Sequence, residues 1–298
     1  MPLSDISSSK VSTAVEVQSY YQCLFLSCTF TVVLWGISVI QLYAYFKTHC
    51  KNDSWKLRCY VVFVFCLNTA HQCTVSRWGY HIFVEEPGNE LALVRLNAVE
   101  LPLITMLTAL VDVMVQAYYI SRIWNLSKRN ILLAIVVSTA TIGQFTATLY
   151  YFSKIYNLFV VIHTGLFINI SRVLYATTAF VEIFLSSVFV ILMHRMRNGQ
   201  KRSETVINRL ILYTISSSAV NAAFAIAAVV SAVAAPNVYI HLLFASLAPN
   251  LYTDALLALL NTRTSIWSVF DSNSTDETEI TTELFRGQIG SRNESLDV

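Results

Sequence analysis

Seven long apolar stretches constrain the fold of this chain more than any other feature of its sequence. A helix needs about 20 mostly apolar residues to cross the roughly 30 Å hydrocarbon core of a bilayer. The stretches that meet this requirement are Tyr21–Phe46, Cys59–Tyr80, Leu96–Ile120, Ile131–Phe152, Ile168–His194, Leu210–Ala235 and Tyr239–Leu260. They lack the alternation of β-barrel strands, and helices satisfy their backbone polar groups within the segment. The sequence therefore predicts an all-α, polytopic membrane protein with a seven-transmembrane-helix bundle.

The low content of charged residues agrees with a chain that is solvated largely by lipid. Charged residues make up 13% of the sequence, whereas soluble domains average about 25%. No soluble module is left over to present a basic face, so we expect no nucleic-acid partner. The expected surroundings are the lipid bilayer, at the plasma membrane or an endomembrane.

The distribution of Lys and Arg between the loops predicts the orientation. The cation-rich loops are Lys47–Arg58, Ser121–Asn130 and Arg195–Arg209, and the alternate loops are His81–Arg95, Ser153–Phe167 and Pro236–Val238. Because cation-rich loops stay in the cytoplasm, the N-terminus is expected outside and the C-terminus inside. This divides the chain into an extracellular segment (1–20), a transmembrane domain (21–263) and a disordered acidic cytoplasmic tail (264–298). The basic inner loops could bind a cytoplasmic partner.

Two charged residues near the outer membrane surface form a candidate ion pair. Arg77 lies about one turn from the outer end of the second stretch, and Glu100 lies at a similar depth in the third. Antiparallel neighbouring helices would bring them together. The alternative is that Arg77 extends alone to the lipid headgroups.

Four ionisable residues lie deeper in the predicted bundle: His71, Asp112, Glu182 and Asp254. An acid or base at the bilayer centre costs roughly 2.5–3.5 kcal/mol on insertion, so each one calls for a partner. One interpretation is a polar cluster that binds protons or cations, in which Asp112 and Asp254 share a depth. The other is a set of separate interhelical hydrogen bonds that fix the packing.

No motif in the chain indicates catalysis or a cofactor. His71 and His241 fall at different depths and lack the spacing of zinc ligands. The last stretch has no Lys that could hold retinal. We therefore expect no enzyme activity, no cofactor and no metal, and an intramembrane hydrolase is the least favoured class.

Several motifs resemble a large fungal family, abundant in basidiomycetes, of seven-helix membrane proteins that are defined by a domain of unknown function. The matching stretches are Ile40–Phe46, Leu67–His71, Gln116–Asn130, Met196–Ile215 and Leu251–Arg263. The resemblance covers roughly residues 21–263, and implies a seven-helix membrane fold without an assigned activity. This chain departs from the family pattern at Asn68, Asp254 and Ser216–Ser218.

Two function classes follow from the sequence. The first is a sensory, receptor-like or scaffolding seven-helix protein with an unidentified small-molecule ligand. It has the expected helix count, but Ile120-Ser121-Arg122 stands where many receptors have Asp-Arg-Tyr. The second is a transporter or an ion- or proton-conducting protein that uses the intramembrane acids, although no internal repeat supports it.

Overall fold

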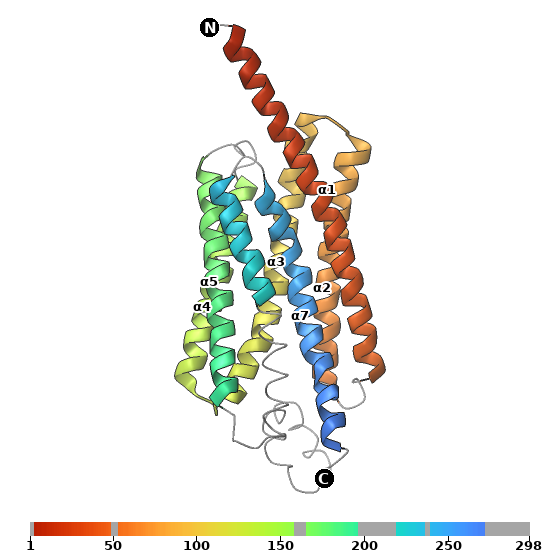
Figure 1. Ribbon diagram of the computed structural model, residues 1–298, viewed down its shortest axis with the longest axis vertical. Coiled ribbons are helices and arrows are strands. Elements are labelled where there is room, and N and C mark those ends of the chain that lie inside the picture. Colours follow the sequence, from red (N-terminus) through yellow and green to blue (C-terminus); the bar gives the residue numbers. More distant parts are fainter. Residues whose placement is uncertain (1–2, 49–52, 158–164, 196–218, 236–238, 272–298) are drawn as a thin grey trace.

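The computed structural model describes residues 3–48, 53–157, 165–195, 219–235 and 239–271. The described residues form helices joined by turns, with no strand among them. The helices are α1 (Leu3–Thr48), α2 (Trp55–Tyr80), the π-helix η1 (His81–Glu85), α3 (Glu90–Leu126), α4 (Ile131–Asn157), α5 (Gly165–Arg195), the helix Ala219–Ala234 and α7 (Ile240–Asp271). They stand side by side in one upright bundle (Figure 1). The predicted all-helical class is confirmed.

Six helical segments are long and apolar enough to cross a membrane. They are Val17–Thr48, Trp55–Glu85, Val99–Leu126, Ile131–Ile155, Asn169–Leu192 and Ile240–Asn261. The helix Ala219–Ala234 is apolar but shorter, and the first part of the predicted span Leu210–Ala235 lies outside the described residues. These segments indicate a multi-pass membrane protein.

Two helices continue beyond the apolar stretches that the sequence predicts. α1 begins at Leu3, so most of the predicted extracellular segment is helical and extends above the bundle (Figure 1). α7 ends at Asp271 and includes the first residues of the predicted disordered tail. The polar residues of these extensions do not match an apolar period, but they continue a helix that the membrane part has already nucleated. Residues 272–298 lie outside the described part of the chain.

Local sequence signals account for the helix ends and interruptions. Ser54 precedes α2 in an extended conformation, and its hydroxyl accepts a hydrogen bond from the Leu57 amide, as expected of a helix N-cap. Pro249 lies inside α7, where it removes a backbone donor and leaves the Ala245 carbonyl without its usual partner. Pro102 does the same in α3.

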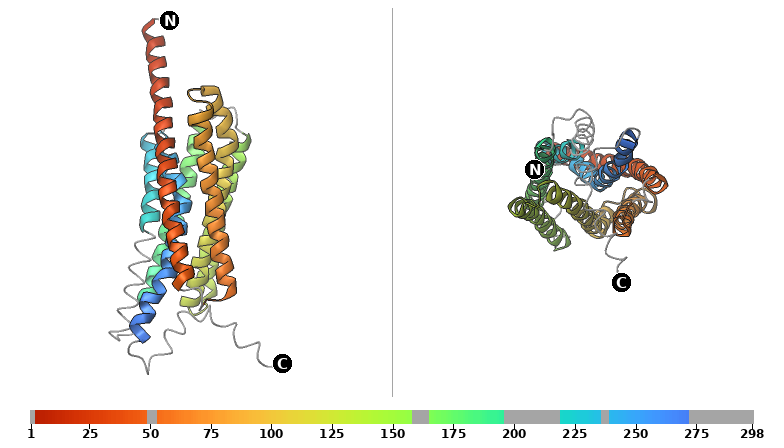
Figure 2. Two further views of the ribbon diagram at one scale, coloured as in Figure 1. Left: turned by 90° about the vertical axis from the view of Figure 1, so that its right-hand side faces the viewer. Right: turned by 90° about the horizontal axis from the view of Figure 1, so that it is seen from below.

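The first and last helices lie next to each other and run in the same direction. α1 packs along α7, and α3 contacts α2, α4, α5 and α7. Both α1 and α7 begin at the upper end of the bundle in Figure 1 and end at its lower end. Figure 2 shows the same arrangement from the side and from below. We call these ends upper and lower throughout.

The lower half of the bundle holds one continuous apolar core. It includes Tyr45, Val61, Val115, Ile123, Val137, Phe189 and Leu260, which come from α1, α2, α3, α4, α5 and α7. The upper half holds smaller, separate clusters. One contains Tyr20, Val75, Trp78 and Ile104, a second contains Tyr151, Ile155 and Leu174, and a third contains Tyr175, Ala228 and Ala232. The upper half is therefore the place where the packing leaves room.

Large apolar side chains cover the outside of the bundle. Ile40, Leu132, Val173 and Phe180 are each more than 60% exposed. A soluble monomer rarely exposes contiguous apolar area of this extent, whereas lipid solvates such side chains. The exposed faces therefore agree with the membrane spans.

Candidate functional site

A cavity of about 110 Å³ lies between the helices in the upper and middle parts of the bundle. α3, α4, α5, the helix Ala219–Ala234 and α7 supply its walls, and α2 contributes Trp78. Aromatic side chains form much of the wall: Trp78, Tyr151, Tyr175, Phe224, Phe244 and Tyr252. This volume is somewhat smaller than the roughly 150 Å³ cavity that holds benzene, so the space limits a ligand to about the size of a single ring.

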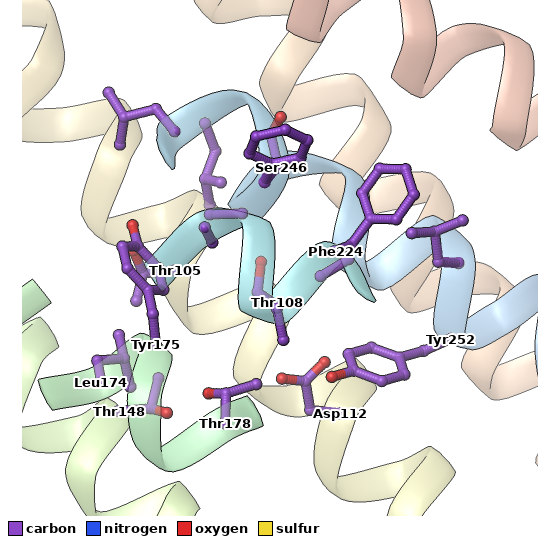
Figure 3. Close-up of a pocket in the computed structure, with 18 of the residues that line it drawn as sticks. Thr105, Thr108, Asp112, Thr148, Leu174, Tyr175, Thr178, Phe224, Ser246 and Tyr252 are labelled. Carbon is purple, nitrogen blue, oxygen red and sulfur yellow. The ribbon is translucent and has the colours of Figure 1, made fainter. Parts of the chain in front are cut away.

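Asp112 provides the acid of the cavity. Its side chain is 9% exposed, and its Oδ1 has no hydrogen-bond partner among the described residues. In Figure 3 the carboxyl group points toward the hydroxyl of Tyr252, and Thr178 lies beside it. Thr105, Thr108 and Asp112 line the cavity together because positions i, i+3 and i+7 share one face of a helix.

Glu182 lies behind this acid, in a network of amide and phenol groups. Gln116 donates from Nε2 to Glu182 Oε1 at 3.2 Å and to Gln144 Oε1 at 2.8 Å. Glu182 also interacts with the hydroxyl of Tyr252, and electrostatically with Asp112. The structure thus brings two of the four predicted residues, Asp112 and Glu182, into one site on either side of Tyr252.

Asp254 faces α1 and does not line the cavity, so the structure does not bring it together with Asp112 as one interpretation of the sequence expected. Ser38 of α1 donates from Oγ to Asp254 Oδ1 at 2.5 Å. Successive helical residues turn by about 100°, so Asp254 points away from Tyr252 and the cavity. The sequence showed that Asp112 and Asp254 share a depth, but depth does not determine which face of α7 each neighbour meets.

His71 is fully buried but does not line the cavity. Neither of its ring nitrogens has a hydrogen-bond partner among the described residues. One turn away, Asn68 donates from Nδ2 to Asn250 Oδ1 at 3.0 Å, which links α2 to α7 beside Pro249. No described contact joins His71 to the three acids.

Arg77 and Glu100 lie together at the upper end of the bundle. Arg77 Nε is 3.2 Å from Glu100 Oε1, and the two side chains are 66% and 2% exposed. Arg77 Nε also lies 3.3 Å from His81 Nε2. The pair links α2 to α3 next to Trp78 and Leu101, which line the cavity.

Sequence reasoning missed several residues of the site, although a helical pattern contained them. Tyr175, Thr178 and Glu182 follow a spacing of three and four residues and share one face of α5. Tyr252 of α7 also lines the cavity. Asn221 lines the cavity, and its Oδ1 has no described partner. No group of three or more His, Cys, Asp or Glu that could hold a metal occurs in the described part of the chain.

Comparison with known families gives one match. A domain described as "Family of unknown function (DUF6534)" is found at residues 178–265. This region contains Thr178, Glu182, Asn221, Tyr252 and Asp254, and hence much of three cavity walls, whereas Asp112 lies before it. No curated protein and no solved structure matches the chain.

Proposed function

We propose that this protein is a receptor-like seven-helix membrane protein that binds a small molecule in the cavity between its helices. It acts by binding rather than by catalysis. The observation that carries the proposal is the cavity itself, which combines aromatic walls with two buried acceptors that have no donor among the described residues, Asp112 Oδ1 and Asn221 Oδ1. Ligand sites are typically apolar spaces with a few such polar groups.

The seventh crossing is supported by the direction of the helices. α1 and α7 both run from the upper to the lower end (Figure 1), which requires an odd number of crossings. The six candidate spans together with Leu210–Ala235 satisfy this requirement. Lys47 at the end of α1 and Arg195 at the end of α5 lie at the lower end, so the positive-inside rule favours a cytoplasmic lower end and an external N-terminus. In this proposal the domain at residues 178–265 represents the fungal seven-helix family that the sequence motifs resemble.

α7 offers a physical link between the cavity and the lower end. Tyr252 lines the cavity, and Pro249 lies one turn before it. A proline-interrupted helix can bend at this point, so occupancy of the cavity would change the angle of the lower half of α7. The basic loops at that end would then present a different surface to a cytoplasmic partner.

A cavity-filling variant tests the proposal. Ala228 is 3% exposed and lines the cavity, whereas Val230 on the same helix is 56% exposed. Native mass spectrometry should detect a copurifying small molecule on the wild type and on Val230→Phe, but not on Ala228→Phe. Hydrogen exchange in the α3–α4 turn should differ between occupied and empty protein. A wild type without any bound molecule, or an Ala228→Phe variant that retains it, would contradict the proposal.

A proton- or ion-conducting protein is the second candidate, and one observation favours it. A space of about 10 Å³, lined by Gln116, Glu182 and Tyr252 among others, lies next to the main cavity, and Tyr252 lines both. Such a volume is close to that of one water molecule. If this path conducts, proteoliposomes with an internal pH dye should show a flux that Glu182→Gln abolishes. The continuous apolar core below it favours the receptor-like function.

A further inference from the structure

Three hydroxyl groups in the cavity wall, those of Thr105, Thr148 and Ser246, offer acceptors rather than donors. Thr105 donates to the Leu101 carbonyl at 2.8 Å, Thr148 to the Gln144 carbonyl at 3.0 Å, and Ser246 to the Leu243 carbonyl at 2.9 Å. A hydroxyl has a single hydrogen, so each of these groups has only oxygen lone pairs left for a ligand.

On the packed side of the same protein, one threonine hydroxyl both donates and accepts a hydrogen bond. Thr69 donates to the Phe65 carbonyl at 2.9 Å and accepts a hydrogen bond from Trp35 Nε1 at 3.2 Å. In the cavity, no described donor reaches Thr105, Thr148 or Ser246. The lone pairs of these oxygens are therefore available to donors on whatever occupies the space.

Two stronger acceptors lack donors in the same wall. Asp112 Oδ1 and Asn221 Oδ1 are both buried without a hydrogen-bond partner in the part of the chain that the structure describes. An unpaired buried polar group costs about 1–3 kcal/mol, so a ligand that donates to these oxygens would recover this free energy on binding. The site is therefore complementary to a molecule with several N–H or O–H donors.

The charges around the cavity specify the sign of the ligand. None of the described residues that line it is Lys, Arg or His. His241 packs against the ring of Tyr175 at 5.9 Å and is not part of the wall. Asp112 and Glu182 are two acids in one low-dielectric region, which disfavours binding of an anionic ligand. Aromatic faces also attract organic cations.

We propose that the cavity binds a small organic amine, with its ammonium group at Asp112 and its apolar body among Trp78, Phe224 and Tyr175. This inference rests on the proposed function, because it names the class of the small molecule. An ammonium group supplies both the positive charge and several donors, whereas a neutral alcohol supplies one donor and no charge.

Three probes of similar shape test the inference: phenethylamine, 2-phenylethanol and 3-phenylpropionate. Binding to the full chain is measured by titration calorimetry in phosphatidylcholine nanodiscs, with empty nanodiscs as the blank. We expect phenethylamine to bind at least tenfold more tightly than 2-phenylethanol, and 3-phenylpropionate not to bind. Asp112→Asn should remove the preference for the amine. Asp254→Asn, which changes a half-buried acid outside the cavity, should retain it.

A second variant keeps the test valid if Asp112→Asn fails to fold. Asn221→Leu removes one acceptor, and should weaken phenethylamine binding severalfold while leaving 2-phenylethanol unchanged. Equal binding of amine and alcohol would overturn the amine assignment and leave the cavity as a neutral-ligand site. Stabilisation of the wild type by potassium chloride in place of the amine would also overturn it, in favour of an inorganic cation. If none of the probes binds, the amine assignment fails, and the Ala228→Phe experiment decides separately whether the cavity binds any molecule.

Discussion

α7 carries two polar residues with different roles on opposite faces of one helix turn. Asp254 faces α1, where Ser38 completes its hydrogen bonding. Tyr252 faces the cavity, where it meets Asp112, whose Oδ1 has no partner. Asp112 and Asp254 are both costly to place in a membrane. Of the two, only Asp254 receives a hydrogen bond from a described side chain.

We use the presence or absence of a described hydrogen-bond partner to separate polar residues that link helices from polar residues that are available to a ligand. On the side of α1 and α2, the Asn68–Asn250 and Trp35–Thr69 pairs link neighbouring helices by direct hydrogen bonds, although Asn68 Oδ1 and Asn250 Nδ2 have no partner among the described residues. On the cavity side, acceptors outnumber the donors that reach them. Four predictions test this division, in order of expected effect.

The largest effect is expected where a satisfied acid loses its partner. Ser38→Ala should lower the free energy of unfolding by about 1–3 kcal/mol, because the half-buried Asp254 carboxyl loses its described hydrogen-bond donor. Thermal unfolding in detergent, followed by the loss of helical circular dichroism, would measure it. Ser187→Ala is the control, because the Ser187 hydroxyl is exposed and bonds only to its own helix. Equal effects of the two changes would show that the Ser38–Asp254 contact stabilises nothing.

The opposite sign is expected at the cavity. Asp112→Leu should raise the stability of the empty protein by about 1 kcal/mol, because it removes an acid whose Oδ1 is already unsatisfied. Such gains at the expense of binding are common at functional sites. The measurement is the same unfolding curve on protein stripped of ligand. A loss of stability would place Asp112 among the structural residues and remove the distinction between the two faces.

The class of the fold could be predicted from the sequence, whereas the grouping of the acids could not. Apolar length alone predicts helices in a membrane, and six of these segments are found. The predicted span Leu96–Ile120 placed Asp112 beyond the middle of its helix, but the observed segment Val99–Leu126 places it near the centre. The direction in which Asp112 and Asp254 point depends on which helix packs on each face, and this tertiary information is not contained in hydropathy.

A moderate effect is expected at the ion pair on the upper edge of the cavity. Arg77→Gln should destabilise the protein more than Glu100→Gln, because Glu100 is 2% exposed and Arg77 is 66% exposed. The coupling energy between the two changes should be about 0.5–1 kcal/mol, since solvent screens the exposed partner. A double-mutant cycle of unfolding free energies measures it. If the two losses of unfolding free energy simply add, Arg77 and Glu100 do not stabilise the upper edge of the cavity as a pair.

The smallest effect is expected from two threonines that differ only in what reaches their oxygen. Thr69 and Thr105 both donate to their own helix, but only Thr69 accepts a described hydrogen bond, from Trp35. Thr69→Val should therefore cost about 0.6 kcal/mol, the average for an interhelical hydrogen bond in a membrane, whereas Thr105→Val should leave the empty protein unchanged. With phenethylamine bound, Thr105→Val should become unfavourable if the amine uses this acceptor, and Thr69→Val should cost the same as before. A ligand-dependent change at Thr105 and not at Thr69 would distinguish a hydroxyl that accepts a hydrogen bond from the ligand from one that already accepts a hydrogen bond within the protein.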